Sequence, residues 1–303
     1  MIPVTVVGGF LGAGKTTLVN HLLHTATRRY AVLVNDFGAV DVDAALVRDR
    51  DGGVLSLANG CVCCSIGPDL GDALDRLARR DPAPEHILVE ASGVSDPWRI
   101  AQLVKLEPSV ALDAVLVLVD AAAFPGQLAD RYLTDTLERQ LARADLIVLN
   151  KCDAAAPDAA EAAVRRLRPD ARMVRVANAE LPEALLAGPA GPDAPTSRFA
   201  AGAPAHPFRS WVWRDPAPFD GLQLARMLDG LPPAVLRVKG FCRVGPDGGQ
   251  HLLQLAGRRW SLRPAAGQDD ALVVIGTTDM PSPAGLDALF RAALLAAACV
   301  AGP

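Results

Sequence analysis

Residues 4–17 of this chain read VTVVGGFLGAGKTT, beginning at Val4 and ending at Thr17. The segment starts with β-branched residues that favour a strand, and from Gly9 to Thr16 it matches the pattern G-x-x-x-x-G-K-[ST]. Apolar residues at helical spacing follow, which predicts a helix from about Thr16. A strand, a glycine-rich loop and a helix in this order are typical of the phosphate-binding loop, or P-loop, of nucleotide hydrolases. We therefore predict a nucleotide site here; the alternative is a chance glycine-rich turn.

The chemistry of phosphate binding assigns roles within this loop. Glycines allow backbone N–H groups to close around the β-phosphate, and the positive end of the following helix favours the anion. Lys15 is expected to reach between the β- and γ-phosphates, and the Thr16 hydroxyl is expected to bind Mg²⁺. Both are therefore candidate catalytic residues. The residues expected to bind nucleotide in this segment are Gly9, Gly12, Ala13, Gly14, Lys15, Thr16 and Thr17.

A second motif, Asn150-Lys151-Cys152-Asp153, predicts which base is bound. It follows the apolar run Leu146–Leu149 and fits the pattern N-K-x-D of guanine-nucleotide-binding proteins. The Asp153 carboxylate can accept hydrogen bonds from the N1–H and the N2 amine of guanine, an arrangement that adenine does not offer. The Lys151 stem can lie along the ring face. We therefore expect Asn150, Lys151 and Asp153 to bind GTP or GDP.

Two carboxylates follow apolar runs and are expected near the phosphates. Asp36 lies in NDFG (35–38), and Glu90 lies in EASG (90–93). Side chains at the carboxyl ends of parallel strands point into the ligand crevice. Asp36 and Glu90 are therefore candidate catalytic residues, with Glu90 holding Mg²⁺ through water and the Gly93 N–H contacting the γ-phosphate. Each carboxylate could instead cap a helix or lie solvated in a loop.

Three of the six cysteines, Cys61, Cys63 and Cys64, cluster in NGCVCC (59–64). Adjacent cysteines seldom bridge each other, so the cluster indicates metal binding or redox chemistry. Thiolates favour Zn²⁺ or Cu(I) and accept Co²⁺. In an extended loop, Cys61 and Cys63 would point to one side, with Cys64 reached after a turn. Three ligands leave a fourth position open, which suits a site that releases its ion. Inert packing, a redox switch and a closed zinc site completed by a distant histidine are the alternatives.

The order of apolar and helical segments predicts a P-loop α/β domain with a mainly parallel sheet, over residues 1–186. A Pro- and Gly-rich linker, 187–207, leads to a smaller α+β domain, 208–303, with one antiparallel sheet. In the second domain we expect a helix over Phe219–Leu228 and a final helix that begins near Ala284 and buries Ala292–Ala301. The runs expected to form strands of the first sheet are Val4–Val7, Ala31–Val34, Val54–Leu57, Ile87–Val89, Ala114–Val119 and Leu146–Leu149. Those of the second sheet are Phe208–Trp213, Val235–Val244, His251–Leu255, Arg259–Leu262 and Ala271–Ile275.

Charge and hydropathy indicate which classes of partner are not expected. The 303 residues carry a net charge of −4, which gives no broad electrostatic footprint for nucleic acid. The N-terminal segment lacks a signal-peptide pattern, and the most apolar late stretch is shorter than the ~20 residues of a spanning helix. We therefore expect a cytoplasmic protein with no membrane or nucleic-acid partner. The sequence allows a homo-oligomer.

Taken in order, these motifs resemble those of the CobW family of metallochaperone GTPases. The matching segments are GGFLGAGKTT (8–17), NGCVCC (59–64), EASG (90–93) and LRVKGF (236–241), so the resemblance covers nearly the whole chain. It implies a GTPase that binds Zn²⁺ or a related ion at Cys61, Cys63 and Cys64 and passes it to a client protein. It also implies that the C-terminal domain contributes to client contact. Two features differ: the linker has His206 in place of a His-rich stretch, and Asp36 stands where relatives often have Glu.

These observations suggest how GTP and the metal are coupled. The γ-phosphate and Mg²⁺ would order the loops that carry or flank the cysteines and raise metal affinity, and hydrolysis would release the ion to the client metalloprotein. No arginine finger or water-positioning glutamine can be named from the sequence. Turnover is therefore expected to be slow, within a decade or two of the ~10⁻⁴–10⁻² s⁻¹ of unassisted GTPases. The rival functions are a zinc-responsive scaffold or enzyme activator and a P-loop kinase.

Overall fold

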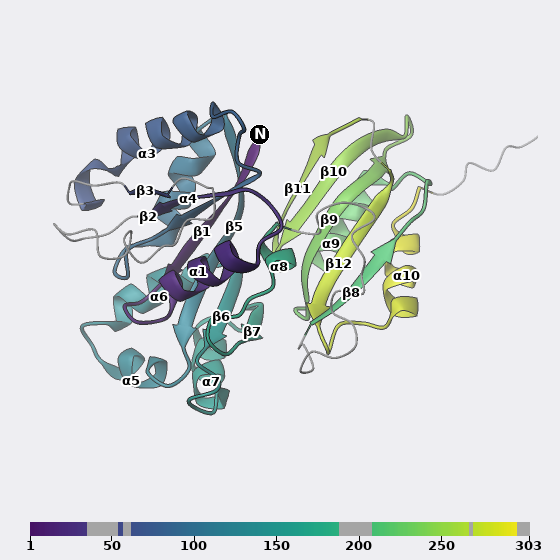
Figure 1. Ribbon diagram of the computed structural model, residues 1–303. Helices are drawn as coiled ribbons and strands as arrows, with labels where there is room; N and C mark the ends of the chain where they lie inside the picture. The colour runs from purple at the N-terminus through teal and green to yellow at the C-terminus, as the bar shows by residue number, and fades with distance from the viewer. Residues whose placement is uncertain (35–53, 57–61, 188–207, 267–268, 296–303) are drawn as a thin grey trace, which may run out of the picture. The chain divides into compact units, whose positions relative to one another are not determined.

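The computed structural model describes residues 1–34, 54–56, 62–187, 208–266 and 269–295, giving the backbone alone for 54–56, 62–69 and 187 (Figure 1). Contacts between Cα atoms divide the chain into two compact units, Met1–Ala187 and Gly188–Pro303. Within the described residues, every helix is too short or too polar to cross a bilayer.

The first unit is built on a seven-stranded sheet in the order β3-β2-β4-β1-β5-β6-β7. Every neighbouring pair of its described strands is parallel. The strands are continuous apolar runs because helices cover both faces of a parallel sheet. The predicted α/β class is therefore confirmed. The strands are β1 (Ile2–Gly9), β2 (Tyr30–Val34), β3 (Val54–Ser56), β4 (His86–Glu90), β5 (Val110–Asp120), β6 (Leu146–Asn150) and β7 (Met173–Arg175).

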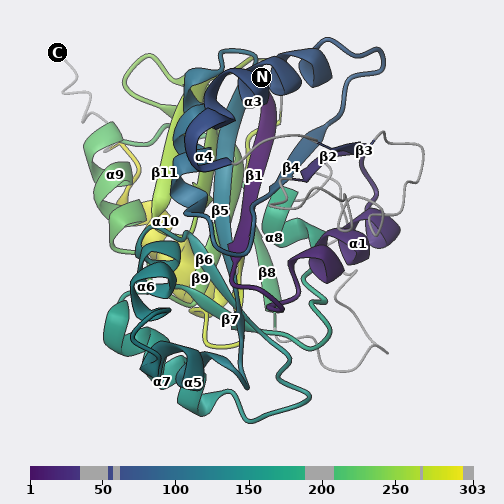
Figure 2. The ribbon, with the colours of Figure 1, turned by 90° about the vertical axis from the view of Figure 1, so that its left-hand side faces the viewer.

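Helices lie on both faces of this sheet (Figures 1 and 2). One face carries an apolar core shared with α3, α4, α6 and α7, and α1 lies on the other face and buries Leu18, Val19 and Leu22. The P-loop therefore joins the central strand β1 to a helix whose buried side packs on the sheet. The helices are α1 (Lys15–Thr25), α3 (Val62–Ala78), α4 (Pro97–Leu106), α5 (Phe124–Ala129), α6 (Thr134–Ala142), α7 (Asp158–Leu167) and α8 (Glu183–Ala187).

Strand order determines which loops share an edge of the sheet. After β1 the chain crosses to β2, and it later returns to place β4 and β5 on opposite sides of β1. In register, Val7 of β1 lies beside Glu90, and Asp120 of β5 lies beside Asn150 of β6. The carboxyl ends of β4, β1, β5 and β6 thus line one edge at the point where strand order reverses, which is where open α/β sheets bind ligands.

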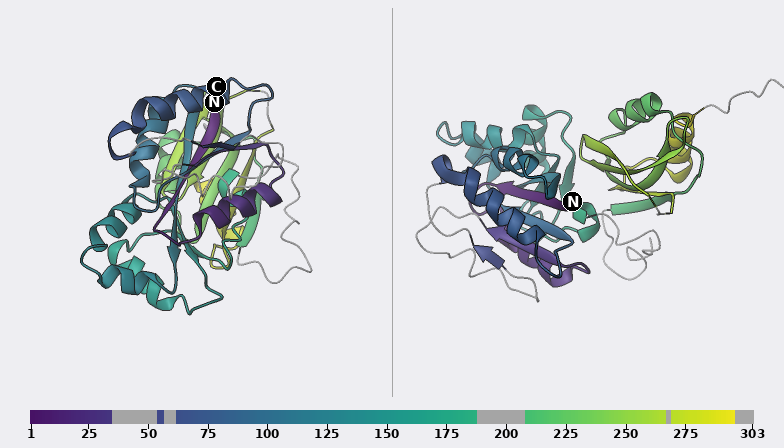
Figure 3. Two further views of the ribbon diagram at one scale, coloured as in Figure 1. Left: turned by 60° about the vertical axis from the view of Figure 1, so that its left-hand side comes forward. Right: turned by 90° about the horizontal axis from the view of Figure 1, so that it is seen from above.

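The second unit contains a five-stranded antiparallel sheet in the order β11-β10-β9-β12-β8. Its two described helices pack on one face of this sheet, where their apolar residues share a core with Val238, Leu253 and Val274 (Figure 3). The predicted α+β class is confirmed. The elements are β8 (Phe208–Trp213), α9 (Gly221–Asp229), β9 (Val235–Val244), β10 (Gly249–Ala256), β11 (Arg259–Pro264), β12 (Ala271–Thr277) and α10 (Pro283–Ala292).

Two helix boundaries of the second unit differ from the prediction. The α9 helix begins at Gly221 rather than Phe219, because the side chain of Asp220 caps it and Phe219 instead forms a bridge with Val244. The final helix was predicted to begin near Ala284, which agrees with its start at Pro283, but its end was predicted wrongly. It ends at Ala292, and the chain then turns back so that Leu294 forms a bridge with Phe219. Tertiary pairing therefore outweighs the helix propensity of the alanine-rich stretch. Residues 296–303, which include the rest of that stretch, and residues 188–207 of the predicted linker lie outside the described part.

Candidate functional site

The P-loop turns sharply between β1 and α1. Gly14 precedes the first helical residue with φ 100°, a conformation that L side chains rarely adopt. A Cβ at this position would collide with the side-chain amide of Asn150. The first turn of α1 contains Lys15, Thr16 and Thr17, whose N–H groups have no acceptor within the helix. The loop therefore has the backbone form that binds phosphate at a helix N-terminus.

Lys15 lies inside this loop rather than out in solvent. Its side chain is buried, with Nζ donating to the carbonyl oxygens of Gly9 at 3.0 Å and Phe10 at 3.3 Å. The Ala13 N–H also donates to the Phe10 carbonyl, at 3.1 Å, which closes the turn. The ammonium is thus held where the backbone curves, among the groups that would surround a β-phosphate.

Thr16 and Glu90 meet across the edge of the sheet. The Thr16 hydroxyl donates to Glu90 Oε1 at 2.9 Å, although 74 residues separate them. Glu90 ends β4 and is 2% exposed. A hydroxyl and a carboxylate beside a phosphate loop form the hard oxygen donor set that Mg²⁺ prefers. These two residues therefore fit the magnesium site predicted from the sequence.

The segment that follows Glu90 packs directly on the P-loop. The Ala91 N–H donates to the carbonyl of Val7 in β1 at 2.8 Å. Gly93 is buried, and a Cβ there would lie 2.5 Å from Leu11 Cδ2 and 2.9 Å from the Leu11 backbone nitrogen. Only a glycine leaves room for this approach. Gly93 is therefore placed beside the P-loop, as its predicted γ-phosphate contact requires.

Asn150 joins two loops. Its Nδ2 donates to the Ala13 carbonyl at 2.9 Å, and its Oδ1 accepts from the Ala179 N–H at 2.7 Å. Asn150 is buried, with 2% of its surface exposed. Asn150 thus ties the P-loop to the segment after β7, and its contact with nucleotide stays a prediction.

Lys151 adopts φ 62°, an uncommon backbone conformation for a residue with a side chain. Its Nζ forms an ion pair with Asp120 Oδ2 at 2.7 Å. Asp120 Oδ1 accepts from the N–H groups of Ala122 at 2.9 Å and Ala123 at 3.1 Å. Burial would raise the pKa of the Asp120 carboxyl, but the hydrogen bonds from Lys151, Ala123 and Ala122 outweigh it and lower that pKa below its ordinary value. Asp120 therefore holds the lysine in place as an anion.

Asp153 has an exposed side chain at the same edge, so its carboxylate can accept hydrogen bonds from a base. Cys152 lies between Lys151 and Asp153 and points inward, with Sγ 3.2 Å from the Leu149 carbonyl. Burial is the main cause that raises the pKa of the Cys152 thiol. Cys152 is therefore a packed thiol rather than a reactive one.

The cysteine cluster is only partly described. Asp36 and Cys61 lie outside the described residues. Cys63 and Cys64 fall in the first turn of α3, which begins at Val62. The expectation of an extended loop after Cys61 is thus wrong, because the helix starts one residue later and successive helical residues do not alternate sides. Within the part of the chain that has described side chains, no group of three or more His, Cys, Asp or Glu residues could hold a metal ion.

Three features of this edge were missed by sequence reasoning. Asp120 ends a strand, so the rule that identified Glu90 would also have found it. Ala179, with φ 56°, has no sequence signal, because alanine rarely adopts that conformation. Gln140 of α6 donates from Nε2 to the carbonyl oxygens of Gly93 and Ser95, both at 3.0 Å. A lone glutamine on a helix gives no indication of a contact 47 residues away.

Comparisons with known proteins cover both units of the chain. One family model, described as the CobW/HypB/UreG nucleotide-binding domain, matches residues 3–175, and a second, the cobalamin synthesis protein CobW C-terminal domain, matches residues 208–294. The chain is 33% identical over 181 residues to a zinc chaperone CobW of Sinorhizobium sp., which covers 50% of this chain and 51% of that protein. It is 38% identical over 163 residues to the zinc chaperone YjiA of Escherichia coli K12, covering 51% of this chain and 50% of that protein. The matches thus span about half the length of these curated relatives. Among solved structures, the Zn(II)-bound YjiA GTPase from E. coli aligns at 24% identity with a TM-score of 0.44, covering 97% of this chain and 99% of that one.

Proposed function

This chain belongs to the CobW family, with a CobW/HypB/UreG nucleotide-binding domain followed by a CobW C-terminal domain, and from that premise we propose that it is a GTP-hydrolysing zinc chaperone. In this proposal it binds GTP with Mg²⁺, holds Zn²⁺ at Cys61, Cys63 and Cys64, and transfers the ion to a client metalloprotein. Co²⁺ is an alternative cargo, because thiolate sites also accept it.

One observation carries the nucleotide half of the proposal. The P-loop, the Thr16–Glu90 pair and the Asn150–Asp153 motif come from distant parts of the chain, and hydrogen bonds join them at one edge of the sheet. The Asn150 bridge is the informative contact, because it holds the phosphate loop and the proposed base-reading segment at a constant separation. An arrangement of this kind suits a ligand that has phosphates at one end and guanine at the other.

In this proposal the residues of the site have separate roles in GTP binding and hydrolysis. Backbone N–H groups of the P-loop and the Lys15 ammonium bind the β- and γ-phosphates and stabilise the charge that develops on them. Thr16 and Glu90 hold Mg²⁺, which when bound neutralises phosphate oxygens. Asp153 binds the guanine edge, and Lys151, held by Asp120, lies along the ring. The Gly93 N–H senses the γ-phosphate.

The zinc half of the proposal rests on the family and on the three clustered cysteines. The Sinorhizobium and E. coli relatives reported above are named zinc chaperones. The segment with Cys61, Cys63 and Cys64 runs from the connection after β3 into the first turn of α3, before the strand that ends at Glu90. Because β3 and β4 are parallel members of one sheet, this connection leaves the same edge as the Glu90 segment. That shared edge supports coupling between nucleotide and metal.

The nucleotide half is tested by calorimetric titration of the chain with GDP and ADP in the presence of Mg²⁺. We expect GDP to bind more tightly than ADP by at least about 100-fold, because bound adenine would leave the hydrogen-bonding groups of the base site without partners. An Asp153→Ala variant should lose this preference, because it removes the acceptor for N1–H and N2. Equal affinities for GDP and ADP in the unaltered chain would favour a P-loop kinase instead.

The metal half is tested by Zn²⁺ affinity in chelator competition, with Mg²⁺ and either a non-hydrolysable GTP analogue or GDP. We expect tighter binding with the GTP analogue, by about 5–150-fold, as for typical allosteric coupling. A triple Cys→Ser variant at positions 61, 63 and 64 should lose the tight site, whereas Cys242→Ala should keep it because Cys242 is buried in the second unit. Equal affinity in both nucleotide states would contradict the chaperone mechanism and leave a scaffold or activator.

A further inference from the structure

Gln140 makes a contact that the proposed reaction does not yet use. It lies in α6 with 2% of its surface exposed, and its Nε2 donates to two carbonyl oxygens of the segment after β4. The distances to Gly93 and Ser95 are both 3.0 Å. One buried amide therefore holds both ends of the short turn Gly93–Ser95.

This turn is the part of the segment that approaches the P-loop. Ser95 N–H and Oγ donate to the Ser92 carbonyl, at 3.1 and 2.9 Å, and give the turn its shape. Gly93 packs so closely on Leu11 that no side chain would fit. The position of the turn is thus set from one side by the P-loop and from the other by Gln140.

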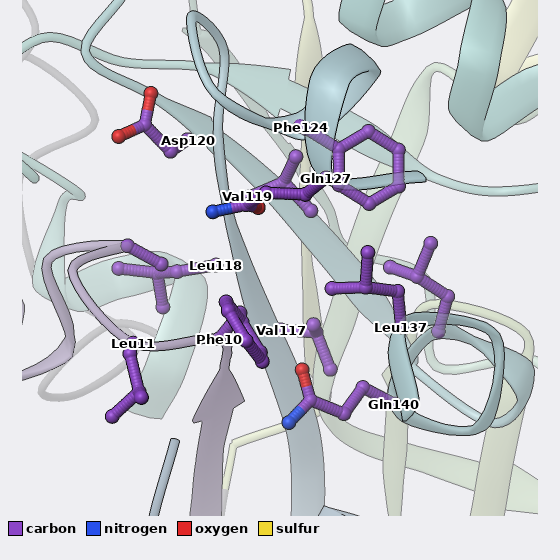
Figure 4. A pocket seen from close by; sticks show the side chains of 12 residues that line it. Phe10, Leu11, Val117, Leu118, Val119, Asp120, Phe124, Gln127, Leu137 and Gln140 are labelled. Atoms are coloured by element: carbon purple, nitrogen blue, oxygen red, sulfur yellow. The ribbon is translucent and has the colours of Figure 1, made fainter. Parts of the chain in front are cut away.

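Gln140 lines a small, mainly apolar pocket (Figure 4). Figure 4 shows Gln140 reaching from α6 toward Phe10, where β1 runs into the P-loop. Leu137 and Leu141 of the same helix line the pocket, so the amide lies among apolar side chains. Polar groups in such surroundings stay hydrogen-bonded, because an unpaired carbonyl is costly there. The two bonds from Gln140 are therefore expected to persist when the loop is loaded by a ligand.

We infer that Gln140 is a positioning residue that sets Gly93 against the P-loop before nucleotide binds, and so favours nucleotides that have a γ-phosphate. This inference rests on the proposed GTPase function. A loop already in place spends less free energy on ordering when the γ-phosphate arrives. GDP has no γ-phosphate, so its affinity does not depend on where Gly93 lies. Gln140 acts through Gly93 and is not itself a catalytic residue.

The test compares Gln140→Met with the unaltered chain. Methionine is similar in length to glutamine but cannot donate to the two carbonyls. Dissociation constants for a non-hydrolysable GTP analogue and for GDP are measured with Mg²⁺. We expect analogue binding to weaken by about tenfold while GDP binding changes by less than about twofold, within the range of ordinary allosteric coupling. A merely structural role would weaken both nucleotides together.

Gln127→Met is the matched control. Gln127 lines the same pocket from α5, and its side chain makes no hydrogen bond within the described part of the chain. The variant removes an amide from the same surroundings but leaves Gly93 and Ser95 held, so both dissociation constants should stay unchanged. If Gln127→Met reproduced the effect of Gln140→Met, the contact with the loop would not be its cause, and the inference would be wrong.

A second readout does not depend on nucleotide. Amide hydrogen exchange of the nucleotide-free protein should quicken at Ala91 and Ser95 in Gln140→Met, because their bonds lie in the segment that Gln140 holds. If Gln140→Met changed neither the exchange rates of these amides nor the ratio of the two nucleotide affinities, the role inferred for Gln140 would be wrong. The proposed GTPase function would not be affected by that result. If the unaltered chain bound neither guanine nucleotide, the proposed function would fail and the inference with it.

Discussion

At the end of β5, the Asp120 carboxylate binds two neighbours at once. One oxygen accepts from the backbone of the turn that follows, and the other pairs with Lys151 at the end of the next strand. The lysine has the positive φ of 62° described above, so its side chain leaves the backbone in a direction that few residues adopt. We interpret the ion pair as the reason that this lysine stays beside the proposed base position.

Replacement of Asp120 by Asn should weaken guanine-nucleotide binding without unfolding the protein. The amide oxygen can still accept from Ala122 and Ala123, but the charge that holds Lys151 is lost. Because both nucleotides have the base, affinities for GTP and GDP should fall together by about fivefold, equivalent to about 1 kcal/mol for a partly exposed pair. Titration calorimetry measures this. The control Asp130→Asn, in the same connection but bonded to Tyr132 N–H, should change neither affinity.

The pH dependence of this pair follows from the direction of the Asp120 pKa. The folded-state pKa is below the ordinary value of 3.8, so the pair adds stability that is fully present above the unfolded pKa and is lost as pH falls through the folded one. The difference in unfolding free energy between the unaltered chain and Asp120→Asn should therefore be constant from neutral pH to about pH 5. It should shrink progressively as the pH falls below about 5. Urea unfolding across this range would contradict the assignment if the difference shrank near pH 6.

Gly14→Ala should damage the P-loop in two ways. Its φ of 100° strains any side chain, and the new methyl group would push against the Asn150 amide. Gly12, with φ 75° and open space around it, is the matched control because Gly12→Ala meets the strain alone. We expect Gly12→Ala to cost about 1–2 kcal/mol of unfolding free energy and Gly14→Ala to cost more. Equal losses in urea unfolding would show that the Asn150 contact does not limit this position.

Among the helices, α4 has the clearest link between its own stability and the site, because it begins directly after the turn that Gln140 holds. Asp96 is its N-cap and accepts from the Trp98 N–H at 2.9 Å, and Pro97 occupies the first helical position. Proline is favoured there because its fixed φ suits the helix and its missing N–H needs no partner. The cap and the proline together determine where the turn ends and the helix begins.

Loss of this cap should destabilise the first unit by about 1 kcal/mol. The Asp96→Ala variant leaves the Trp98 N–H without its acceptor, whereas Asp96→Ser keeps a side-chain oxygen and should stay close to the unaltered chain. Thermal and urea unfolding measure the difference. A Ser variant as unstable as the Ala variant would mean that the carboxylate acts through its charge rather than as a cap.

Elements with a strong local pattern could be predicted from the sequence. Continuous apolar runs predict six of the seven described strands of the first sheet, all except β7, because strands covered on both faces need no alternation. The end of the last helix at Ala292 could not be predicted. It depends on the bridge between Leu294 and Phe219, which are distant in the sequence. The site divides in the same way. Lys15, Thr16 and Glu90 follow from local motifs, but the contacts of Gln140 and Ala179 exist only in the folded chain.

At the scale of the whole molecule, the two units have separate hydrophobic cores. The first core lies between the parallel sheet and helices such as α4 and α6, and the second lies between the antiparallel sheet and α9 and α10. Each described residue of the nucleotide site belongs to the first unit. Nucleotide binding is therefore expected to be a property of that unit.

A fragment comprising residues 1–187 should fold cooperatively and bind GDP within about twofold of the full chain, as expected for a domain with its own core. Transfer of zinc to a client, in contrast, should be lost if the second unit provides client contact. Calorimetry with GDP and a metal-transfer assay on the same fragment measure the two properties. A fragment that folds but does not bind GDP would show that the second unit contributes to the nucleotide site.

The Asn150 bridge has a consequence for how such a protein can change over generations. Its amide satisfies the Ala13 carbonyl on one side and the Ala179 N–H on the other, so any substitution there disturbs two loops at once. Asp153, three residues later, is exposed and can be exchanged without that penalty. A lineage, or a protein engineer, is therefore free to alter base preference at Asp153 while Asn150 stays constant. The fold separates the residue that can be tuned from the residue that must be inherited unchanged.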